Sequence, residues 1–249
     1  MLQKIISTKQ HAITQLPTLD PTVLAASERN FLTALQQTPF AIIAEMKQKS
    51  PSEGLLDKNY DPATRAQAYA AGGATALSVL TDTPFFGGDY SHINAARAAC
   101  HLPVLCKDFI IDTQQIYAAL AAGADACLLI VRILTDTQLQ QLKHTIEALN
   151  MTALIEVFSE EDLHRALAVN AQLIGINNRD LDTLVMDTTL SALLQQNIDP
   201  DITCLSLSGI QTPDMVQTLK DQQFDGVLMG TCLMRAEDPA KFLRQCIGR

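Results

Sequence analysis

Several features are missing from the sequence, and each absence excludes a class of protein. No apolar run reaches the roughly 18 residues that a membrane-spanning helix needs. The first six residues, Met-Leu-Gln-Lys-Ile-Ile, lack the apolar core and cleavage site of a secretory signal. We therefore expect a cytoplasmic protein with no membrane partner.

The cysteines lack the spacing of a metal site or a redox pair. None of the six belongs to a C-x-x-C motif, and several lie inside apolar runs. This pattern favours buried free thiols over disulfides, and it predicts no metal. The cysteines are Cys100, Cys106, Cys127, Cys204, Cys232 and Cys246.

Basic residues are few. The chain has 18 lysines and arginines against 27 acidic residues, which gives a net charge of −9. This balance argues against nucleic-acid binding, which depends on neutralising phosphates. An anionic substrate would need a local basic patch, because the overall field of the protein repels it.

Alternating apolar runs and helix-like segments dominate the rest of the chain. The apolar fraction of 47% and charged fraction of 18% predict a globular protein, and 249 residues suit one large barrel. The apolar runs are 41–44, 76–80, 103–106, 127–131, 153–157, 173–176, 202–207 and 227–229. The helix-like segments are 61–71, 89–99, 112–122, 135–149, 159–168, 188–195, 212–219 and 238–247. Eight such units predict an α/β fold, the (β/α)₈ TIM barrel, with a doubly wound sheet as the alternative.

The expected domain is a single barrel over residues 1–249, of which 1–38 form an N-terminal helical extension. One helical piece contains Leu2, Ile5 and Ile6. The other follows Ser27 and carries an apolar stripe that includes Phe31. Glycines before several strands, as in 71–74, 122–126 and 224–226, support repeated helix–strand units.

The first apolar run ends in charge, which makes 40–52 the central segment. Glu45 and Lys47 lie two residues apart, so both side chains point to the same face of the expected strand. Buried charges are costly unless they are paired or used, although an exposed strand end with an incidental ion pair is the alternative. In a barrel, the active site lies at the carboxyl ends of the strands. The polar residues expected there are Glu45, Lys47, Ser78, Thr81, Lys107, Asp108, Arg132, Glu156, Asn177, Asn178, Arg179, Ser206, Ser208 and Thr231.

Glycines follow the last two strands. Ser208-Gly209 precedes a helix that should begin near Thr212, and Gly230-Thr231 opens another short turn. Backbone N–H groups at such places can approach an anion, and barrels often bind phosphate after strands seven and eight. The alternative is that each glycine belongs to an ordinary turn.

The whole chain resembles the indole-3-glycerol phosphate synthase family of tryptophan biosynthesis. That family is a (β/α)₈ barrel whose N-terminal extension helps to cover the mouth. It converts 1-(2-carboxyphenylamino)-1-deoxyribulose 5-phosphate to indole-3-glycerol phosphate, carbon dioxide and water without a cofactor. The segments that carry the resemblance are 43–47, 50–52, 76–82, 85–88, 107–112, 154–157, 174–181, 208–210 and 229–234.

The resemblance implies a role for each candidate residue. Lys107 would be the general acid that protonates the ketone, and Glu156 the acid–base partner for loss of the hydroxyl. Lys47 would hold the substrate carboxylate and share in proton transfer, with Glu45 tuning it. The remaining substrate-binding residues would be Asn177, Ser50, Arg179 and Ser208, and the phosphate-binding residues would be Gly209, Gly230 and Thr231.

These residue types suit the chemistry. Carbon–carbon bond formation at a ketone needs a proton donor, and a lysine can supply one if its surroundings lower its pKa towards neutrality. Loss of the hydroxyl needs both an acid and a base. The aromatic ring would rest on apolar residues at the mouth, for which plain core packing is an equal alternative. Those candidates are Phe85, Phe86, Phe109 and residues 128–130.

The chain departs from the family pattern in ways that could alter rate or substrate orientation. Leu207 stands where the family has a glutamate, and Phe158 where it often has a histidine. Glu53 makes the loop after the first strand less basic, while Thr231 keeps the hydroxyl of the usual serine.

Two rival interpretations remain at this stage. A phosphoribosyl isomerase of the same fold would carry an aspartate on strand six, where this chain has Asn177. A non-catalytic phosphosugar-binding barrel is favoured only by Leu207. In all three cases the expected ligand is a small phosphosugar and the chain a monomer or weak homo-oligomer. The N-terminal helices could cover the mouth or contact other tryptophan-pathway enzymes.

Overall fold

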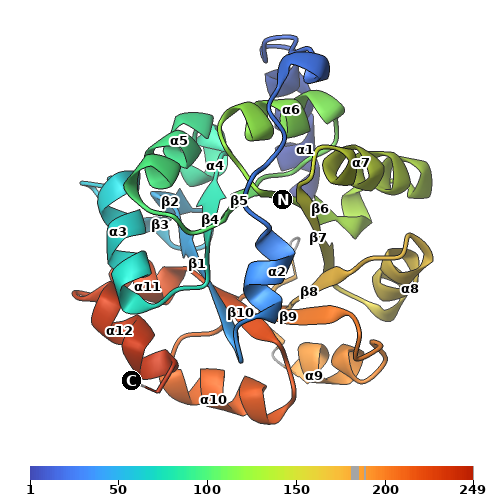
Figure 1. Cartoon of the computed structure of the whole chain (residues 1–249). Helices are drawn as coiled ribbons and strands as arrows, with labels where there is room; N and C mark the ends of the chain where they lie inside the picture. Colours follow the sequence, from blue (N-terminus) through green and yellow to red (C-terminus); the bar gives the residue numbers. More distant parts are fainter. Residues whose placement is uncertain (181–184, 188, 249) are drawn as a thin grey trace.

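The computed structural model describes residues 1–180, 185–187 and 189–248 (Figure 1). Eight parallel strands close into a barrel in the order β1-β10-β9-β8-β7-β6-β5-β4, and β4 pairs with β1. The predicted (β/α)₈ barrel is confirmed, and each predicted run is a barrel strand. The strands are β1 (Ala41–Met46), β4 (Ala76–Leu80), β5 (Val104–Lys107), β6 (Ala126–Ile130), β7 (Thr152–Val157), β8 (Leu173–Asn177), β9 (Thr203–Leu207) and β10 (Gly226–Met229).

Helices follow the strands and surround the barrel. They are α3 (Pro62–Gly72), α4 (Thr83–Phe86), α5 (Tyr90–Ala99), α6 (Thr113–Ala121), the 3-10 turn η2 (Val131–Ile133), α7 (Asp136–Ala148), α8 (Glu160–Ala168), α9 (Thr189–Gln195), α10 (Pro213–Asp221), α11 (Thr231–Arg235) and α12 (Pro239–Cys246). Most begin at a side chain that accepts a backbone N–H, as Asp61 does for α3 and Thr212 for α10. The expected helix over 188–195 is α9, and residue 188 lies outside the described residues.

The strands bury both faces, which explains why their sequences do not alternate. Side chains such as Ile43, Leu105 and Leu154 point into the barrel and form one cluster. Their chain neighbours, such as Ile42, point outwards and pack against the helices in a second cluster. Side-chain direction therefore alternates along a strand while burial does not.

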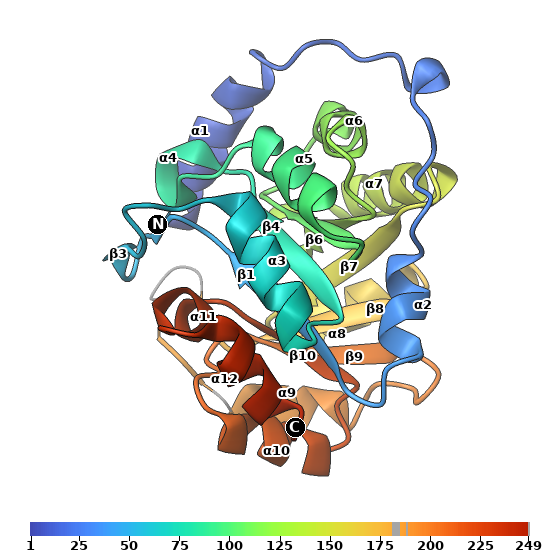
Figure 2. The ribbon, with the colours of Figure 1, turned by 60° about the vertical axis from the view of Figure 1, so that its left-hand side comes forward.

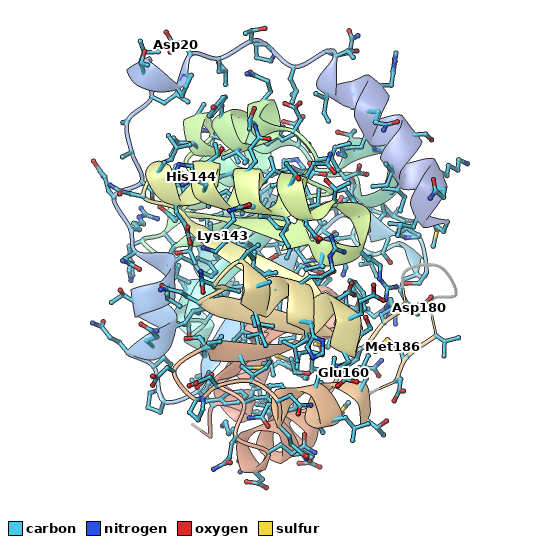
Figure 3. The ribbon with its side chains drawn as sticks, turned by 90° about the vertical axis from the view of Figure 1, so that its right-hand side faces the viewer. Asp20, Lys143, His144, Glu160, Asp180 and Met186 are labelled. Atoms are coloured by element: carbon cyan, nitrogen blue, oxygen red, sulfur yellow. The ribbon has the colours of Figure 1, made fainter. Side chains whose placement is uncertain are left out.

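The N-terminal extension reaches both ends of the barrel. It contains α1 (Leu2–Ile13), a 3-10 turn (Pro21–Val23) and α2 (Phe31–Gln36). Figures 2 and 3 show α1 and α2 on opposite sides of the molecule, joined by an extended segment. Phe31 and Leu35 of α2 are fully buried against the inner cluster, and Gln36 reaches Thr203 at the start of β9. Helix α2 therefore covers the amino-terminal end of the barrel, and the expectation that the extension covers the mouth holds for α1 alone.

The second helix of the extension begins later than Ser27. Its N-cap is Asn30, whose side chain accepts from the N–H of Thr33. Ser27 instead donates to Asp125, which also accepts from Arg97 and so ties the extended segment to the barrel.

The cysteines are free thiols, as predicted. Four are buried, whereas Cys100 and Cys232 are half-buried, so the expected burial is only partly correct. In the ranges 1–180, 185–187 and 189–248, no helix is both long and apolar enough to cross a membrane.

Candidate active site

A cavity of about 300 Å³ lies at the carboxyl ends of the barrel strands. It is closed on one side by Ile5 of α1 and by Met1, the residue that precedes this helix. The candidate residues from the sequence that line it are Glu45, Lys47, Ser50, Lys107, Glu156, Asn177, Arg179, Ser208, Gly209, Gly230 and Thr231. The structure thus brings them together, and their chemical roles stay predictions.

The Glu45 and Lys47 side chains share one face of the chain at the end of β1. The Lys47 ammonium donates a short hydrogen bond to Glu45 Oε1, and both side chains are largely buried. Burial works to raise the pKa of Glu45, but the ammonium groups of Lys47 and Lys107 hold that pKa below its usual value. Glu45 is therefore a carboxylate at neutral pH.

A second lysine–carboxylate pair faces the same cavity. Lys107 at the end of β5 donates to Glu156 Oε2 on β7 over 3.3 Å. Burial lowers the pKa of Lys107, but the carboxylates of Glu156 and Glu45 outweigh burial and hold the pKa above its usual value. The expectation of a lowered pKa is thus wrong: Lys107 is an ammonium that can give a proton but cannot easily act as a base.

The charges around the cavity are balanced. Its basic side chains are Lys47, Lys107, Arg179 and Arg235, and its acidic side chains are Glu45, Glu53, Asp108 and Glu156. The cavity therefore has no excess of basic over acidic side chains, in contrast to the basic patch that was expected. The positive groups are held by carboxylates, and a dianionic ligand would have to compete for them or use backbone N–H groups.

Glycine is needed at two places near the mouth, for different reasons. Gly209 has φ of 81° and follows Ser208 at 65°, so successive left-handed residues turn the chain sharply after β9. Gly230 has no positive φ, but a Cβ there would lie 2.5 Å from Glu45 Oε1. Gly230 therefore makes room for the Glu45 carboxylate.

The turn after β9 is braced by Asn178. Its amide nitrogen donates to the Ser206 hydroxyl and to the carbonyls of Leu207 and Ser208, at 3.0 to 3.2 Å. Asn177, its neighbour, points the other way and lines the cavity. Asn178 therefore supports the turn, while Asn177 lines the cavity.

Some polar residues expected at the mouth do not line the cavity. They are Ser78, Thr81, Arg132, Asn178 and Ser206. The Thr81 hydroxyl donates to Asp108, and the Arg132 guanidinium stacks on Phe158 at 4.1 Å and reaches Asp162 and Asp180. The Phe158 ring is therefore covered by the Arg132 guanidinium. Figure 3 shows Asp180 on the same side of the molecule as α1.

The apolar wall consists mainly of the aromatic and leucine candidates. Phe86 and Phe109 pack with ring centroids 6.2 Å apart, and Leu128, Ile130 and Leu207 complete the wall. Phe85 and Leu129 do not line the cavity. Leu207 is only 1% exposed, and its methyl group would lie 2.5 Å from a Cβ at Gly175, so it fills space that this glycine leaves open.

Sequence reasoning missed two kinds of residue. Arg235, at the end of α11, pairs with Glu53 in the loop after β1, and only its position one helical turn after Thr231 hinted at this. Lys9 lies in a buried ion cluster behind the wall, and its place in an amphipathic helix gave no signal of that.

No group of three His, Cys, Asp or Glu side chains is arranged to hold a metal ion within residues 1–180, 185–187 and 189–248.

Fold and site together define a class: a (β/α)₈ barrel whose mouth holds two lysine–carboxylate pairs beside an apolar wall. The family model for indole-3-glycerol phosphate synthase matches residues 2–246. The chain therefore belongs to the indole-3-glycerol phosphate synthase family.

Individual relatives agree with this membership. The chain is 42% identical to indole-3-glycerol phosphate synthase of Desulfosudis oleivorans over 99% of its length and 98% of the relative. It is 41% identical to indole-3-glycerol phosphate synthase of Polaromonas sp. over 100% of its own length and 98% of the relative. It is also 44% identical to indole-3-glycerol phosphate synthase 2 of Streptomyces coelicolor over 90% and 87%.

Solved structures with low identity support the fold. Thiamine phosphate pyrophosphorylase from Pyrococcus furiosus has a TM-score of 0.62 at 17% identity and covers 84% of this chain and 94% of its own. For 3-hexulose-6-phosphate synthase from Salmonella typhimurium the TM-score is 0.64 at 14% identity, and the match covers 83% of this chain and 96% of that protein. These two similarities concern the barrel and not its chemistry.

Proposed function

We propose that the protein is an indole-3-glycerol phosphate synthase, a carboxy-lyase of tryptophan biosynthesis that acts in the cytoplasm. Its substrate would be 1-(2-carboxyphenylamino)-1-deoxyribulose 5-phosphate, and its products indole-3-glycerol phosphate, carbon dioxide and water. The observation that carries the proposal is the pair of buried lysine–carboxylate contacts facing one cavity in a chain of this family. The fold analogues are too distant to bear on the reaction.

Lys107 gives a proton to the ketone oxygen in the first step. The arene carbon that carries the carboxylate attacks the ketone carbon, and negative charge develops on the oxygen. A buried ammonium directed into the cavity both stabilises that charge and supplies the proton. Its raised pKa keeps it protonated at neutral pH, ready for this step.

Lys47 and Glu45 hold the reacting carboxylate. The Lys47 ammonium is fixed by Glu45 within the cavity lining, where it can pair with the substrate carboxylate during ring closure. Loss of carbon dioxide then restores the aromatic ring and needs no further acid. The apolar wall of Phe86, Phe109 and Leu207 keeps the ring side of the cavity free of water, which favours release of a carboxylate as a neutral molecule.

Glu156 acts in the dehydration that completes the indole. The hydroxyl formed from the ketone must leave as water, and a proton must leave the neighbouring ring carbon. Glu156 lies 3.3 Å from Lys107, so the two groups can return and remove protons at the same side of the intermediate. Asn177 and Ser208 line the cavity nearby and would hold substrate oxygens.

The phosphate would lie at the turns after β9 and β10. Gly209, Gly230 and Thr231 border the cavity there, and Arg179, Ser50 and Arg235 lie on the same lining. Backbone N–H groups at these turns add binding without adding a basic side chain. This explains how a cavity with balanced side-chain charge can accept a phosphorylated substrate.

Turnover of the wild-type protein tests the proposal. The chain has no tryptophan, so indole fluorescence would rise against a low background when the carboxyphenylamino-deoxyribulose phosphate is added. Mass spectrometry would identify the product, and carbon dioxide should appear in equal amount. A protein that binds this substrate without releasing carbon dioxide would be a binding module and would refute the enzyme assignment.

A further inference from the structure

We propose that Lys9 of the N-terminal helix is a positioning residue for Lys107. Its ammonium neutralises the Asp108 carboxylate, next in the chain to Lys107, and so leaves Lys107 directed at Glu156. The inference rests on the proposed function, because it assigns Lys107 the acid role. Lys9 itself does not line the cavity.

Lys9 is a buried cation on an outer helix. It is 6% exposed, whereas Lys4 on the same helix is exposed. Its Nζ lies 2.6 Å from Asp108 Oδ1 and 2.9 Å from Asp82 Oδ2, and both carboxylates are almost completely buried. Burial disfavours the ammonium, but the two carboxylates hold the pKa of Lys9 above its usual value. The helix is thus pinned at two points behind the wall of the cavity, and Figure 2 shows α1 beside α4.

Asp108 is fixed by two hydrogen bonds in addition to its contact with Lys9. Its Oδ2 accepts from the Thr81 hydroxyl at 2.7 Å and its Oδ1 from the N–H of Phe109 at 2.7 Å. The N–H of Thr81 in turn donates to the Lys107 carbonyl. The Asp108 carboxylate is therefore held in place, and its field adds to those that favour the Lys107 ammonium.

Asp82 connects the same cation to the apolar wall. Its Oδ1 caps α4 by accepting from the N–H of Phe85, and its carbonyl accepts from Gly88 at 2.9 Å. Helix α4 carries Phe86, which packs on Phe109. Lys9 therefore links Asp108 and the ring of Phe109, the two residues that follow Lys107 in the chain, to the loop after β4.

Loss of the Lys9 charge would leave two buried carboxylates without their counter-ion. Removing one partner of a buried ion cluster is costly, because the remaining charges stay desolvated. Lys107 directly precedes Asp108 in the chain, and the Asp108 carboxylate is one of the charges that favour its ammonium. It would move towards Asp108 and away from Glu156, and the proton donor would be displaced from the ketone.

Steady-state kinetics of Lys9→Met test this displacement. The expected result is a fall in kcat of about tenfold to a hundredfold, with KM changed less than about threefold. Lys4→Met, which removes an exposed charge from the same helix, should behave as wild type. Lys9→Met/Asp108→Asn should recover most of kcat, because asparagine carries no charge, keeps an oxygen for the Phe109 N–H and can donate its amide N–H to the Thr81 hydroxyl. If Lys9→Met does not fold, as judged by circular dichroism, Lys9→Gln serves in its place.

Reductive methylation of Lys107, read by mass spectrometry, tests the same point without turnover. Added pairing with Asp108 should slow labelling of Lys107 in Lys9→Met, and Asp108→Asn should restore it. A helix that merely loosens would expose Lys107 and speed its labelling. Unchanged kcat, a rise in KM alone, or faster labelling would each overturn the inference. Wild-type protein without turnover would instead refute the proposed function, and the labelling result would still decide the role of Lys9.

Discussion

Gly230 leaves the space that the Glu45 carboxylate occupies: a Cβ at residue 230 would lie 2.5 Å from Glu45 Oε1 and 3.1 Å from Glu45 Cβ. Glu45 lies on β1 and Gly230 directly follows β10, and these two strands pair in register from Ala41 with Gly226 to Ala44 with Met229. The glycine after β10 thus contacts the proposed acid–base centre as well as forming part of the proposed phosphate turn.

Gly230→Ala should therefore displace Glu45 from Lys47. The backbone at Gly230 has φ of −133°, so alanine meets no left-handed strain there. We expect kcat/KM to fall by about tenfold, since a small displacement of a reacting group is enough for that loss. The same substitution in a Glu45→Ala background should cost much less, and equal losses in both backgrounds would show that the effect does not pass through Glu45.

Leu207→Glu should weaken substrate binding and the fold together. Leu207 is 1% exposed and packs over Gly175 and Leu154, so a carboxylate there would be desolvated. It would also tip the balanced cavity towards negative charge and raise KM for the phosphorylated substrate. Thermal unfolding and KM should be compared with Leu207→Gln, which has similar size without charge. A lower KM in the glutamate variant would contradict this view of the cavity.

The ion pair between Glu53 and Arg235 predicts that one substitution weakens substrate binding and that another strengthens it. Arg235→Gln should raise KM several-fold, whereas Glu53→Gln should free Arg235 for phosphate and lower KM modestly. Both effects should shrink at high salt, because the Arg235 side chain is 57% exposed. Lys58→Gln, an exposed position in the same loop region, is the matched control. A rise in KM in Glu53→Gln would mean that the pair supports binding instead of competing with it.

Much of this arrangement could be predicted from the sequence. Eight apolar runs gave the barrel, and their carboxyl ends gave the residues around the cavity. Strands buried on both faces conceal which neighbour points inwards, so Asn177 and Asn178 could not be separated, nor Ser206 from Leu207. Which residues of a strand point into the barrel is set by its pairing with the neighbouring strands, as when β8 and β9 align Asn177 with Leu207.

Ion pairs between residues that are far apart in the chain could not be predicted from the sequence, for another reason. Lys9 meets Asp82 and Asp108 only because α1 folds back across the mouth, and no local pattern encodes that contact. The raised pKa of Lys107 likewise depends on carboxylates from β1 and β7, which lie far away in the chain.

The pKa directions predict a broad pH range for the acid step. Lys107 donates a proton, so its activity is lost as pH rises through its pKa, and that pKa stands above its ordinary 10.5. Glu45 must be ionised to hold Lys47, and its pKa stands below its ordinary 4.5. We therefore expect no loss of kcat between neutral pH and about pH 9 from titration of Lys107. An alkaline limb within that range would show that Lys107 is not the acid or that its pKa falls when substrate binds.

The most direct test of the central claim is turnover by Lys107→Met, followed by indole fluorescence with the carboxyphenylamino-deoxyribulose phosphate in excess. Lys143→Met on α7, whose ammonium pairs with Glu147 outside the cavity, controls for loss of a lysine. We predict that Lys143→Met turns over as the wild type does, while Lys107→Met binds substrate but forms indole at least about a hundredfold more slowly. Turnover by Lys107→Met at the wild-type rate would contradict the account.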